Sequence, residues 1–330
     1  MTLDVLAIGN AIVDVLAHAP EVFLDQHGLV KGSMRLISDD MAEKLYQEMG
    51  NAVESSGGSA GNTVAAMASL GAKTAFAGRV GKDSLGKIFS HDLQSIGVES
   101  YLEQAENGES SARCLTLITP DAERTMCTFL GAARDFSGAA LSAELLGRAS
   151  VVYLEGYLFD QPKAKAAMLA AAAEARLLGR SVALTLSDVF CVERHHEYFL
   201  HLIRNHANLL FCNAAEATTL LGLDFWSEDG AKTFQQWGIT ACITEGAAGA
   251  LIVTPEQLLR IPVAPNIKPV DLTGAGDVFA AGFLYGYTKG WGLDEAAWLG
   301  CRMAGQIIQQ FGARSNRPYT EILREKPPIL

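Results

Sequence analysis

Short apolar runs rich in β-branched residues recur along this chain, and helix-like segments separate them. The runs predict buried strands at residues 5–9, 74–77, 151–154, 182–186, 209–212 and 241–244. Segments with helical spacing lie between them, at residues 62–70, 163–178, 228–237 and 277–289. Strands that alternate with helices favour a mostly parallel sheet, because each crossover places a helix against one face. The pattern therefore predicts an α/β fold of three layers, αβα, around a central sheet.

Two segments interrupt this alternation. Residues 11–37 give short alternating stretches around the turn-prone GLVKGS, and residues 98–130 alternate on either side of Pro120-Asp121, a hairpin-like turn. We expect these segments, about 11–38 and 98–132, to form a small discontinuous β-lid. Because the sequence contains no internal repeat or low-complexity linker, one domain is expected over residues 1–330.

The composition argues against several classes of protein. With 330 residues, 49% of them hydrophobic, the chain can bury a substantial core. Its formal net charge of −11 argues against nucleic-acid binding, which normally requires a basic surface. No signal-peptide pattern is evident, and no apolar run approaches the length of a membrane span. We therefore expect a cytoplasmic protein with no nucleic-acid or membrane partner, either a monomer or a homodimer.

Residues 57–61 read GGSAG and match G-x-S-x-G, the nucleophile elbow of serine hydrolases. That motif requires a strand before the serine, and the polar residues 46–56 predict none. A glycine-rich turn into a helix, with its polar side chains free to hydrogen-bond a ligand, fits better. Residues 81–88 nearly match the phosphate-binding P-loop, but Ile88 stands where a hydroxyl must bind Mg²⁺. A loop that leads into a helix is therefore expected there.

Residues 273–277 read TGAGD, directly before a helix-like run. Small residues at a helix N-terminus let backbone N–H groups approach a phosphate, which indicates an anion hole formed by Gly274, Ala275 and Gly276. An ionised Asp277 beside this hole would repel phosphate, unless it takes the proton from an alcohol that attacks the phosphate. Together these features predict phosphoryl transfer to a hydroxyl. The alternative is a tight turn in which Asp277 only favours the start of the helix.

The stretch DLTGAGD, residues 271–277, resembles the D-T-x-G-A-G-D motif of the ribokinase/PfkB family of carbohydrate and nucleoside kinases. Residues 57–86 resemble the family's other glycine-rich motif, and GNAIVDV at 9–15 resembles its first strand. NAAE at 213–216 and TEGAAGA at 244–250 match the family's N-x-x-E and T-x-G-x-x-G. These motifs follow the family order over nearly the whole chain. The resemblance implies a ribokinase-like fold and an ATP-dependent kinase.

The resemblance also implies roles for individual residues. Asp277 would be the catalytic base beside the anion hole, and Arg124 of the lid would contact phosphate. Mg²⁺ and the nucleotide phosphates would be organised, through water, by Asn213 and Glu216. The rest of the ATP site would include Thr244, Gly246, Gly249 and Thr273. Substrate hydroxyls would be held by residues of the first strand and of the glycine-rich turn: Asn10, Asp14, Gly57, Gly58, Ser59 and Asn62.

One position departs from the family pattern, since Leu272 stands where Thr is usual. The missing hydroxyl bears on an ATP contact or on a site for a monovalent cation such as K⁺, and it leaves the base and the anion hole unchanged. Other interpretations stay open for some residues. Asn213 could cap a helix, Asp14 could belong to a turn of the lid, and Arg124 could be a solvated arginine at the hairpin tip.

The acceptor is expected to carry adjacent hydroxyls. Carboxylate and amide side chains such as those of Asp14 and Asn10 suit adjacent hydroxyls, which indicates a polyol or a ribose. GGSAGN at 57–62 and the segment 23–37 resemble the adenosine kinase branch of the family. This resemblance implies transfer of the ATP γ-phosphate to the 5′-hydroxyl of a nucleoside, with adenosine favoured.

Closure of the lid over the substrate would exclude water and so limit hydrolysis of ATP. Met126, Tyr157 and Phe159 are expected to stack on the base. The alternatives are a sugar kinase of the same family, acting on ribose, fructose or a related sugar, and a catalytically silent nucleoside-binding regulatory protein.

Overall fold

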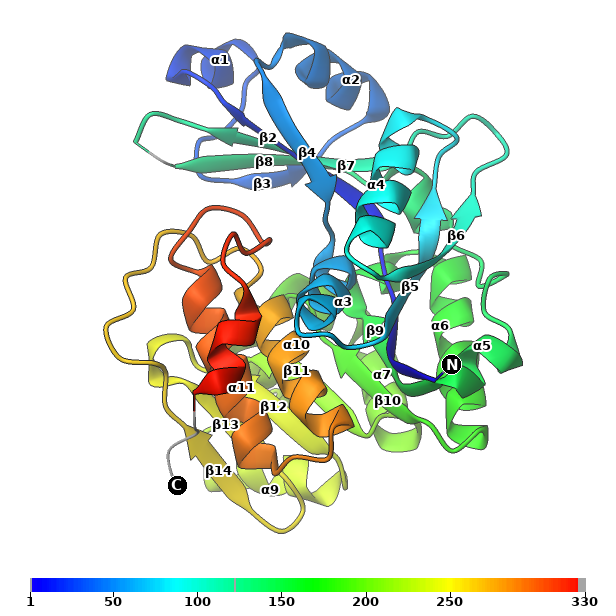
Figure 1. Ribbon diagram of the computed structural model, residues 1–330, viewed down its shortest axis with the longest axis vertical. Helices are drawn as coiled ribbons and strands as arrows, with labels where there is room; N and C mark the ends of the chain where they lie inside the picture. The colour runs from blue at the N-terminus through cyan, green and yellow to red at the C-terminus, as the bar shows by residue number, and fades with distance from the viewer. Residues whose placement is uncertain (1, 122, 326–330) are drawn as a thin grey trace.

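The computed structural model describes residues 2–121 and 123–325, whose strands divide between a large and a small sheet (Figure 1). One domain was expected over residues 1–330; of these, residues 1, 122 and 326–330 lie outside the described residues. None of the helices in the described ranges has the length and apolarity needed to span a bilayer.

The large sheet has the strand order β14-β13-β12-β11-β10-β9-β1-β5-β6. Neighbouring strands are parallel except where β13 pairs with β12 and with β14. Every apolar run predicted as a strand lies in this sheet, which confirms a mostly parallel α/β fold. Its strands are β1 (Leu3–Ile8), β5 (Thr74–Val80), β6 (Glu99–Gln104), β9 (Ala149–Glu155), β10 (Ser181–Thr185), β11 (Leu209–Asn213), β12 (Thr240–Thr244), β13 (Ala250–Val253) and β14 (Leu258–Ile261).

Helices cover both faces of this sheet. One face packs on α3 (Ser59–Ser69), α4 (Ser84–Ser95), α10 (Ala275–Thr288) and α11 (Leu293–Ile307). The other packs on α5 (Ala143–Arg148), α6 (Pro162–Leu177), α7 (Val189–Asn205), α8 (Ala214–Leu221) and α9 (Glu228–Gln236). Short 3₁₀ helices occupy Gly131–Asp135, Gly156–Asp160, Gly246–Ala248 and Tyr319–Arg324.

The first strand shows how the sequence supplies both of these cores. Side chains alternate across a strand, so Val5 and Ala7 join the α10 side while Leu6 and Ile8 join the α6 side. A strand that is apolar at every position must therefore be covered twice, which explains why continuous apolar runs predicted these strands correctly.

The small sheet has the order β3-β8-β7-β2-β4 and lies above one end of the large sheet (Figure 1). Helices α1 (Glu21–Gln26) and α2 (Asp39–Glu48) accompany it. The predicted turn at Pro120-Asp121 joins two of its strands as an antiparallel hairpin. Its strands are β2 (Ile12–His18), β3 (Met34–Leu36), β4 (Ala52–Ser56), β7 (Ala112–Ile118) and β8 (Arg124–Phe129).

The structure corrects the predicted boundaries of the small sheet in two places. Residues 46–56 were expected to contain no strand, but β4 is an edge strand of the small sheet, paired with β2. Most of its residues are only partly covered, so it carries no apolar run that would reveal it. Conversely, β6 falls inside the segment expected to form the lid, yet it pairs with β5 in the large sheet.

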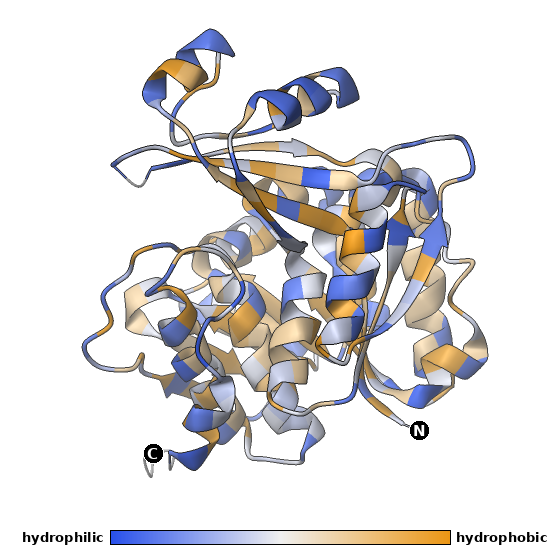
Figure 2. Ribbon diagram, turned by 45° about the horizontal axis from the view of Figure 1, so that its top comes forward, coloured by the Kyte–Doolittle hydropathy of each residue, from blue (hydrophilic) through white to orange (hydrophobic). Residues whose placement is uncertain are grey.

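The small sheet has two different faces. Val13, Val15 and Leu115 point toward the core shared with Leu24 of α1 and Leu45 of α2. The intervening residues point the other way and line a cavity, among them Ile12, Asp14, Leu16, Cys114 and Thr116. Figure 2 shows hydrophobic residues along these strands and hydrophilic ones on the helices above them.

The position of α10 depends on a close crossing with α11. A Cβ at Gly282 would lie 2.7 Å from the backbone N and Cα of Gly300, so only glycine fits at this crossing. Because α10 also carries Asp277 in its first turn, this crossing fixes where that carboxylate lies.

We expect Gly282→Ala to lower the free energy of unfolding by about 1–3 kcal/mol, because backbone atoms must move to admit the methyl group. Urea denaturation followed by circular dichroism measures this. The matched control is Gly147→Ala in α5, where the nearest atom to a new Cβ is Leu178 Cδ1 at 3.8 Å. The control should be neutral or stabilising, since alanine is the better helix former. Equal stability of the two variants would contradict the tight crossing.

Candidate active site

A cavity of about 1670 Å³ lies between the small sheet and the carboxyl ends of the parallel strands, where α/β proteins generally bind ligands. Every site residue predicted from the sequence lines this cavity except Gly57 and Phe159. The lining residues among them are Asn10, Asp14, Gly58, Ser59, Asn62, Arg124, Met126, Tyr157, Asn213, Glu216, Thr244, Gly246, Gly249, Thr273, Gly274, Ala275, Gly276 and Asp277.

Gly57 and Gly58 form the turn that connects β4 of the small sheet to α3. A Cβ at Gly57 would lie 2.3 Å from an oxygen of the Asp14 carboxylate. At Gly58, where φ is +77°, a Cβ would lie 2.4 Å from the Asn10 carbonyl oxygen. Gly57 therefore does not face the cavity. It leaves room behind Asp14, while Gly58 allows the turn to pass close to the first strand.

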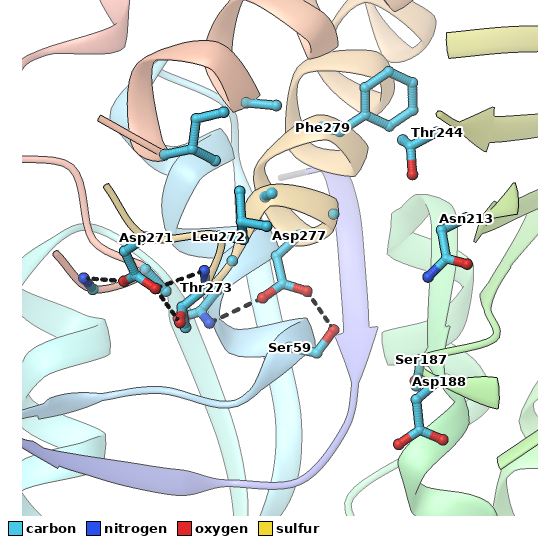
Figure 3. Close-up of a pocket in the computed structure, with 18 of the residues that line it drawn as sticks. Ser59, Ser187, Asp188, Asn213, Thr244, Asp271, Leu272, Thr273, Asp277 and Phe279 are labelled. Carbon is cyan, nitrogen blue, oxygen red and sulfur yellow. Dashed lines mark hydrogen bonds between the residues drawn. The ribbon is translucent and has the colours of Figure 1, made fainter. Parts of the chain in front are cut away.

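Asp277 lies in the first turn of α10, and its carboxylate accepts hydrogen bonds from two residues of α3 (Figure 3). Ser59 Oγ donates to it at 2.6 Å and Asn62 Nδ2 at 3.0 Å. Burial raises the pKa of Asp277, while these hydrogen bonds and the charge of Arg314 oppose the rise. Ser59 thus donates to Asp277, and none of the described residues that line the cavity is a histidine, so these residues do not include the Ser-His pair of a serine hydrolase triad.

The residues of the predicted anion hole lie at the N-terminus of α10, where the Ala275 N–H is already used within the turn. Gly274 adopts φ +77° as the helix cap, and a Cβ there would lie 2.7 Å from Ala313 Cβ. A Cβ at Gly276 would meet nothing within 4 Å, so the space in front of this turn is open. The Ala275 N–H donates to the Leu272 carbonyl at 3.1 Å. Among the described residues, no backbone acceptor in the preceding turn is found for the N–H groups of Gly276 and Asp277, so these groups can face an anion.

Asp14 lies in the middle of β2 and not in a turn of the lid, so that alternative is wrong. No donor among residues 2–121 and 123–325 contacts its carboxylate, although it borders the cavity. Burial raises its pKa to about 6, and the charge of Arg314 opposes this rise. An unbonded carboxylate in a cavity is an acceptor that is ready for the hydroxyl groups of a ligand.

Asn10 is held by Glu155 at the end of β9, a carboxylate that the sequence analysis missed. Glu155 accepts from the Asn10 backbone N–H at 3.2 Å, from Asn10 Nδ2 at 3.0 Å and from the Ala60 N–H at 2.9 Å. Burial raises the pKa of Glu155 to about 7. Its sequence signal was an acidic residue that ends a buried strand, directly after VVYL.

Arg124 begins β8 and reaches across from the small sheet to the body of the protein. Its Nη1 lies 2.7 Å from an Asp271 oxygen and 3.3 Å from Thr273 Oγ1, and its guanidinium stacks over Phe311. The side chain is only 11% exposed, so Arg124 is not a solvated arginine at the hairpin tip. The small sheet is thereby fastened to the loop that leads into the anion hole.

Asn213 and Glu216 form a capping box at the start of α8. Asn213 therefore caps a helix, as one interpretation of the sequence predicted. Asn213 Nδ2 donates to one Glu216 oxygen at 2.6 Å, and the Asn213 N–H donates to the other at 3.1 Å. Burial raises the pKa of Glu216 to about 7. Both residues still border the cavity, and Asn213 lies on the wall opposite Asp277 (Figure 3).

The remaining predicted residues lie at two ends of the cavity. Thr244 ends β12, and Gly246 and Gly249 follow it. All three small residues line the cavity. Tyr157 lines the cavity and donates from its hydroxyl to the Ser187 carbonyl at 3.2 Å. Phe159 does not line it, because its ring is fully buried against Phe199, so the prediction that Phe159 stacks on a base is wrong.

Arg314 is a second charged residue that the sequence did not reveal. It follows α11 in an irregular loop with no motif around it, yet it lines the cavity. Burial lowers its pKa, while the carboxylates of Asp92, Asp14 and Asp277 oppose this change. Only the folded chain brings these residues together.

A mostly parallel sheet with helices on both faces, and a β-lid above the carboxyl ends of its strands, is the architecture of the ribokinase-like phosphotransferases. Residues 29–319 match the pfkB family carbohydrate kinases. The chain belongs to this family of ATP-dependent phosphotransferases.

Similar proteins include adenosine kinases. The structure of adenosine kinase from Sinorhizobium meliloti is 40% identical, with a TM-score of 0.87 over 98% of this chain and 99% of that one. A probable sugar kinase from Rhizobium etli CFN 42 is also 40% identical, with a TM-score of 0.88 over 98% of both chains. Adenosine kinase of Saccharomyces cerevisiae is 28% identical over 94% of this chain and 96% of its own length.

Asp14 should make the stability of the protein depend on pH. Because its pKa rises from 3.8 to about 6 on folding, the folded protein binds this proton more tightly than the unfolded chain does. The contribution of Asp14 to the free energy of unfolding therefore falls as pH rises through that window. Asp14→Asn cannot ionise, so its stability relative to wild type should increase by about 1–3 kcal/mol between roughly pH 3.5 and pH 7.

Urea unfolding at a series of pH values measures this difference. Asp25→Asn, at an exposed position on α1, is the control and should differ from wild type by a constant amount. If the difference for Asp14→Asn is also constant, Asp14 does not carry the burial cost that the structure indicates.

Proposed function

We propose that this protein transfers the γ-phosphate of ATP to the 5′-hydroxyl of a nucleoside, with adenosine as the favoured acceptor. The observation that carries the proposal is the position of Asp277. Its carboxylate lies at the N-terminus of α10 and borders the same cavity as the unbonded carboxylate of Asp14. The proposed base, the anion hole and a carboxylate that can accept hydrogen bonds from substrate hydroxyls therefore border one cavity.

In the proposed reaction, Asp14 and Asn10 hold hydroxyls of the acceptor. Asp277, oriented by Ser59 and Asn62, takes the proton of the attacking hydroxyl. Burial raises the pKa of Asp277, which makes it a better proton acceptor than an exposed carboxylate. The N–H groups at the start of α10 stabilise the charge on the phosphoryl group, and Arg124 adds a positive charge from the small sheet.

The residues at the opposite wall suit Mg²⁺ held through water. Each oxygen of Glu216 accepts one hydrogen bond from Asn213, which favours contact with the metal through water over direct binding. Within the described ranges, no group of at least three His, Cys, Asp or Glu side chains is placed to hold a metal ion. We infer that Asn213 and Glu216 would orient water molecules around a nucleotide-bound Mg²⁺, and that the metal would neutralise charge on the phosphates.

The residues around Leu272 give a monovalent cation less support. One oxygen of Asp271 accepts from Thr273, and the other lies against the Arg124 guanidinium and the Gly312 N–H. Leu272 itself is 67% exposed and contributes no oxygen from its side chain. We derive no step of the reaction through K⁺.

The apolar surface of the small sheet supports a nucleoside over a free sugar. Leu16, Met34, Leu36 and Met126 line the cavity beside the polar groups that suit a ribose. A sugar alone has no large apolar surface to cover them, whereas a base does. The 40% identity to the adenosine kinase of Sinorhizobium meliloti supports the same acceptor.

A sugar kinase is the second candidate, because the probable sugar kinase of Rhizobium etli is equally similar. Coupled assays of ADP release with adenosine, inosine, guanosine, ribose and fructose separate the two. We expect kcat/KM to be highest for adenosine. A higher value for a free sugar would favour the second candidate, and binding of nucleosides without turnover would indicate a silent binding protein.

Asp277→Asn should lower kcat by about 10²–10⁴-fold, because an amide cannot accept the proton. Binding of adenosine, measured by calorimetry, should remain within a few fold of wild type. Asp4→Asn is the control, since Asp4 pairs with Lys289 at the far end of the same helix. Turnover of Asp277→Asn close to that of the control would exclude Asp277 as the base.

A further inference from the structure

Gly312, Ala313 and Arg314 form a segment that contacts three parts of the site in succession. The Gly312 N–H donates to Asp271 at 2.8 Å, and Ala313 packs on Gly274 at the cap of α10. The Arg314 guanidinium continues to Ser56, the last residue of β4 before the glycine turn. This segment therefore joins the loop of the anion hole to the connection between the small sheet and the body.

The Arg314 guanidinium is fixed by three hydrogen bonds to Ser56. Nε and Nη2 donate to the Ser56 carbonyl oxygen at 3.1 and 2.7 Å, and Nη2 donates to Ser56 Oγ at 2.8 Å. Asp92 of α4 holds Ser56 from the other side, accepting from its N–H at 2.8 Å and from its hydroxyl at 2.5 Å. The remaining nitrogen, Nη1, is buried without a hydrogen-bond partner among the described residues.

Hydrogen bonding to Ser56 does not require an arginine. An amide could serve a carbonyl and a hydroxyl, and it would avoid burying a charge, which is costly unless opposite charges lie nearby. Those opposite charges here are the carboxylates of Asp14, Asp92 and Asp277. Two of them are the groups for which the proposed reaction needs the ionised form.

We propose that Arg314 is a positioning residue for phosphoryl transfer: its fixed guanidinium supplies the positive charge that keeps Asp14 and Asp277 ionised where the three residues line the cavity. This inference rests on the proposed function for its consequence in catalysis, but its electrostatic content can be tested separately. Burial raises the pKa of both carboxyls, and the charge of Arg314 opposes the rise in each case.

Other titratable or charged groups also surround the two carboxylates. Arg124 of β8 lowers the pKa of Asp14, while Asp277 raises it. The Asp14 and Asp277 charges in turn act on neighbours from strands β7 and β9 and from the 3₁₀ helix after β9: Cys114, Tyr153, Glu155 and Tyr157. Tyr319 faces Arg314 from the C-terminal 3₁₀ helix. Of the two guanidinium groups, only that of Arg314 acts on both Asp14 and Asp277.

The test is a carboxyl ¹³C NMR titration of the free protein labelled at aspartate Cγ. Asp14→Asn and Asp277→Asn assign the two signals. In Arg314→Gln the pKa of both carboxyls should rise by about 1 unit or more relative to wild type. Arg314→Lys should retain most of the wild-type values, because it keeps the charge but loses the fork that binds Ser56. Arg314→Met, which keeps the apolar stem, replaces Arg314→Gln if that variant does not fold.

The kinetic counterpart is the dependence of kcat on pH with the best acceptor. Activity falls as pH drops through the pKa of the base, so Arg314→Gln should move this fall to higher pH by a similar amount. Arg113→Gln is the matched control, because Arg113 is a buried, ion-paired arginine of β7 that does not line the cavity. Its loss should change stability without moving the pH profile.

The outcomes distinguish the inference from the proposed function. If Arg314→Gln leaves both carboxyl titrations unchanged, or if Arg314→Lys behaves like Arg314→Gln, Arg314 only fastens Ser56 and the inference is wrong. If the titrations shift as expected but wild-type protein phosphorylates no nucleoside, the proposed function fails while the electrostatic role of Arg314 stands.

Discussion

The carboxylate of Asp277 joins the N-termini of two helices, and the rest of the site is arranged around this contact. Asp277 lies in the first turn of α10, while its partners Ser59 and Asn62 lie in the first turns of α3. Both helix ends carry partial positive charge, so a carboxylate between them is stabilised from two directions. Because α3 follows the turn from β4, this contact also ties the small sheet to the helix that forms the anion hole.

The small sheet performs two tasks because its strands have two different faces. In β2, Val13 and Val15 fill the core below α1 and α2, whereas Asp14 between them faces the cavity. A shift of register by one residue would exchange these roles and place a carboxylate in the apolar core. The pairing of β2 with both β4 and β7 prevents such a shift. The strand pairing that stabilises the small sheet therefore also directs the Asp14 carboxylate into the cavity.

The sequence predicted those parts of the structure that depend on local pattern. Continuous apolar runs identified the strands of the large sheet, since both of their faces are buried. The partly exposed β4 has no such run and was missed. Residues of the glycine motifs were found because close backbone contacts restrict them to small side chains. Glu155 and Arg314 belong to no local motif, and only tertiary contacts bring them to Asn10 and Asp14.

The cost of burying a carboxylate is offset in different ways in this cavity. Some carboxylates accept hydrogen bonds from the protein and have a supporting role, whereas others have no such donor and can bind a ligand. Glu155 accepts hydrogen bonds from Asn10 and Ala60, and Glu216 accepts from Asn213, so their oxygens are already engaged. Within the described part of the chain, Asp14 accepts no hydrogen bond, and only charges oppose its burial. A carboxylate that is neutralised at a distance but left without a donor gains most from hydroxyl groups brought by a ligand. Of Glu155, Glu216 and Asp14, it is therefore Asp14 whose carboxylate remains available to bind hydroxyl groups of the substrate.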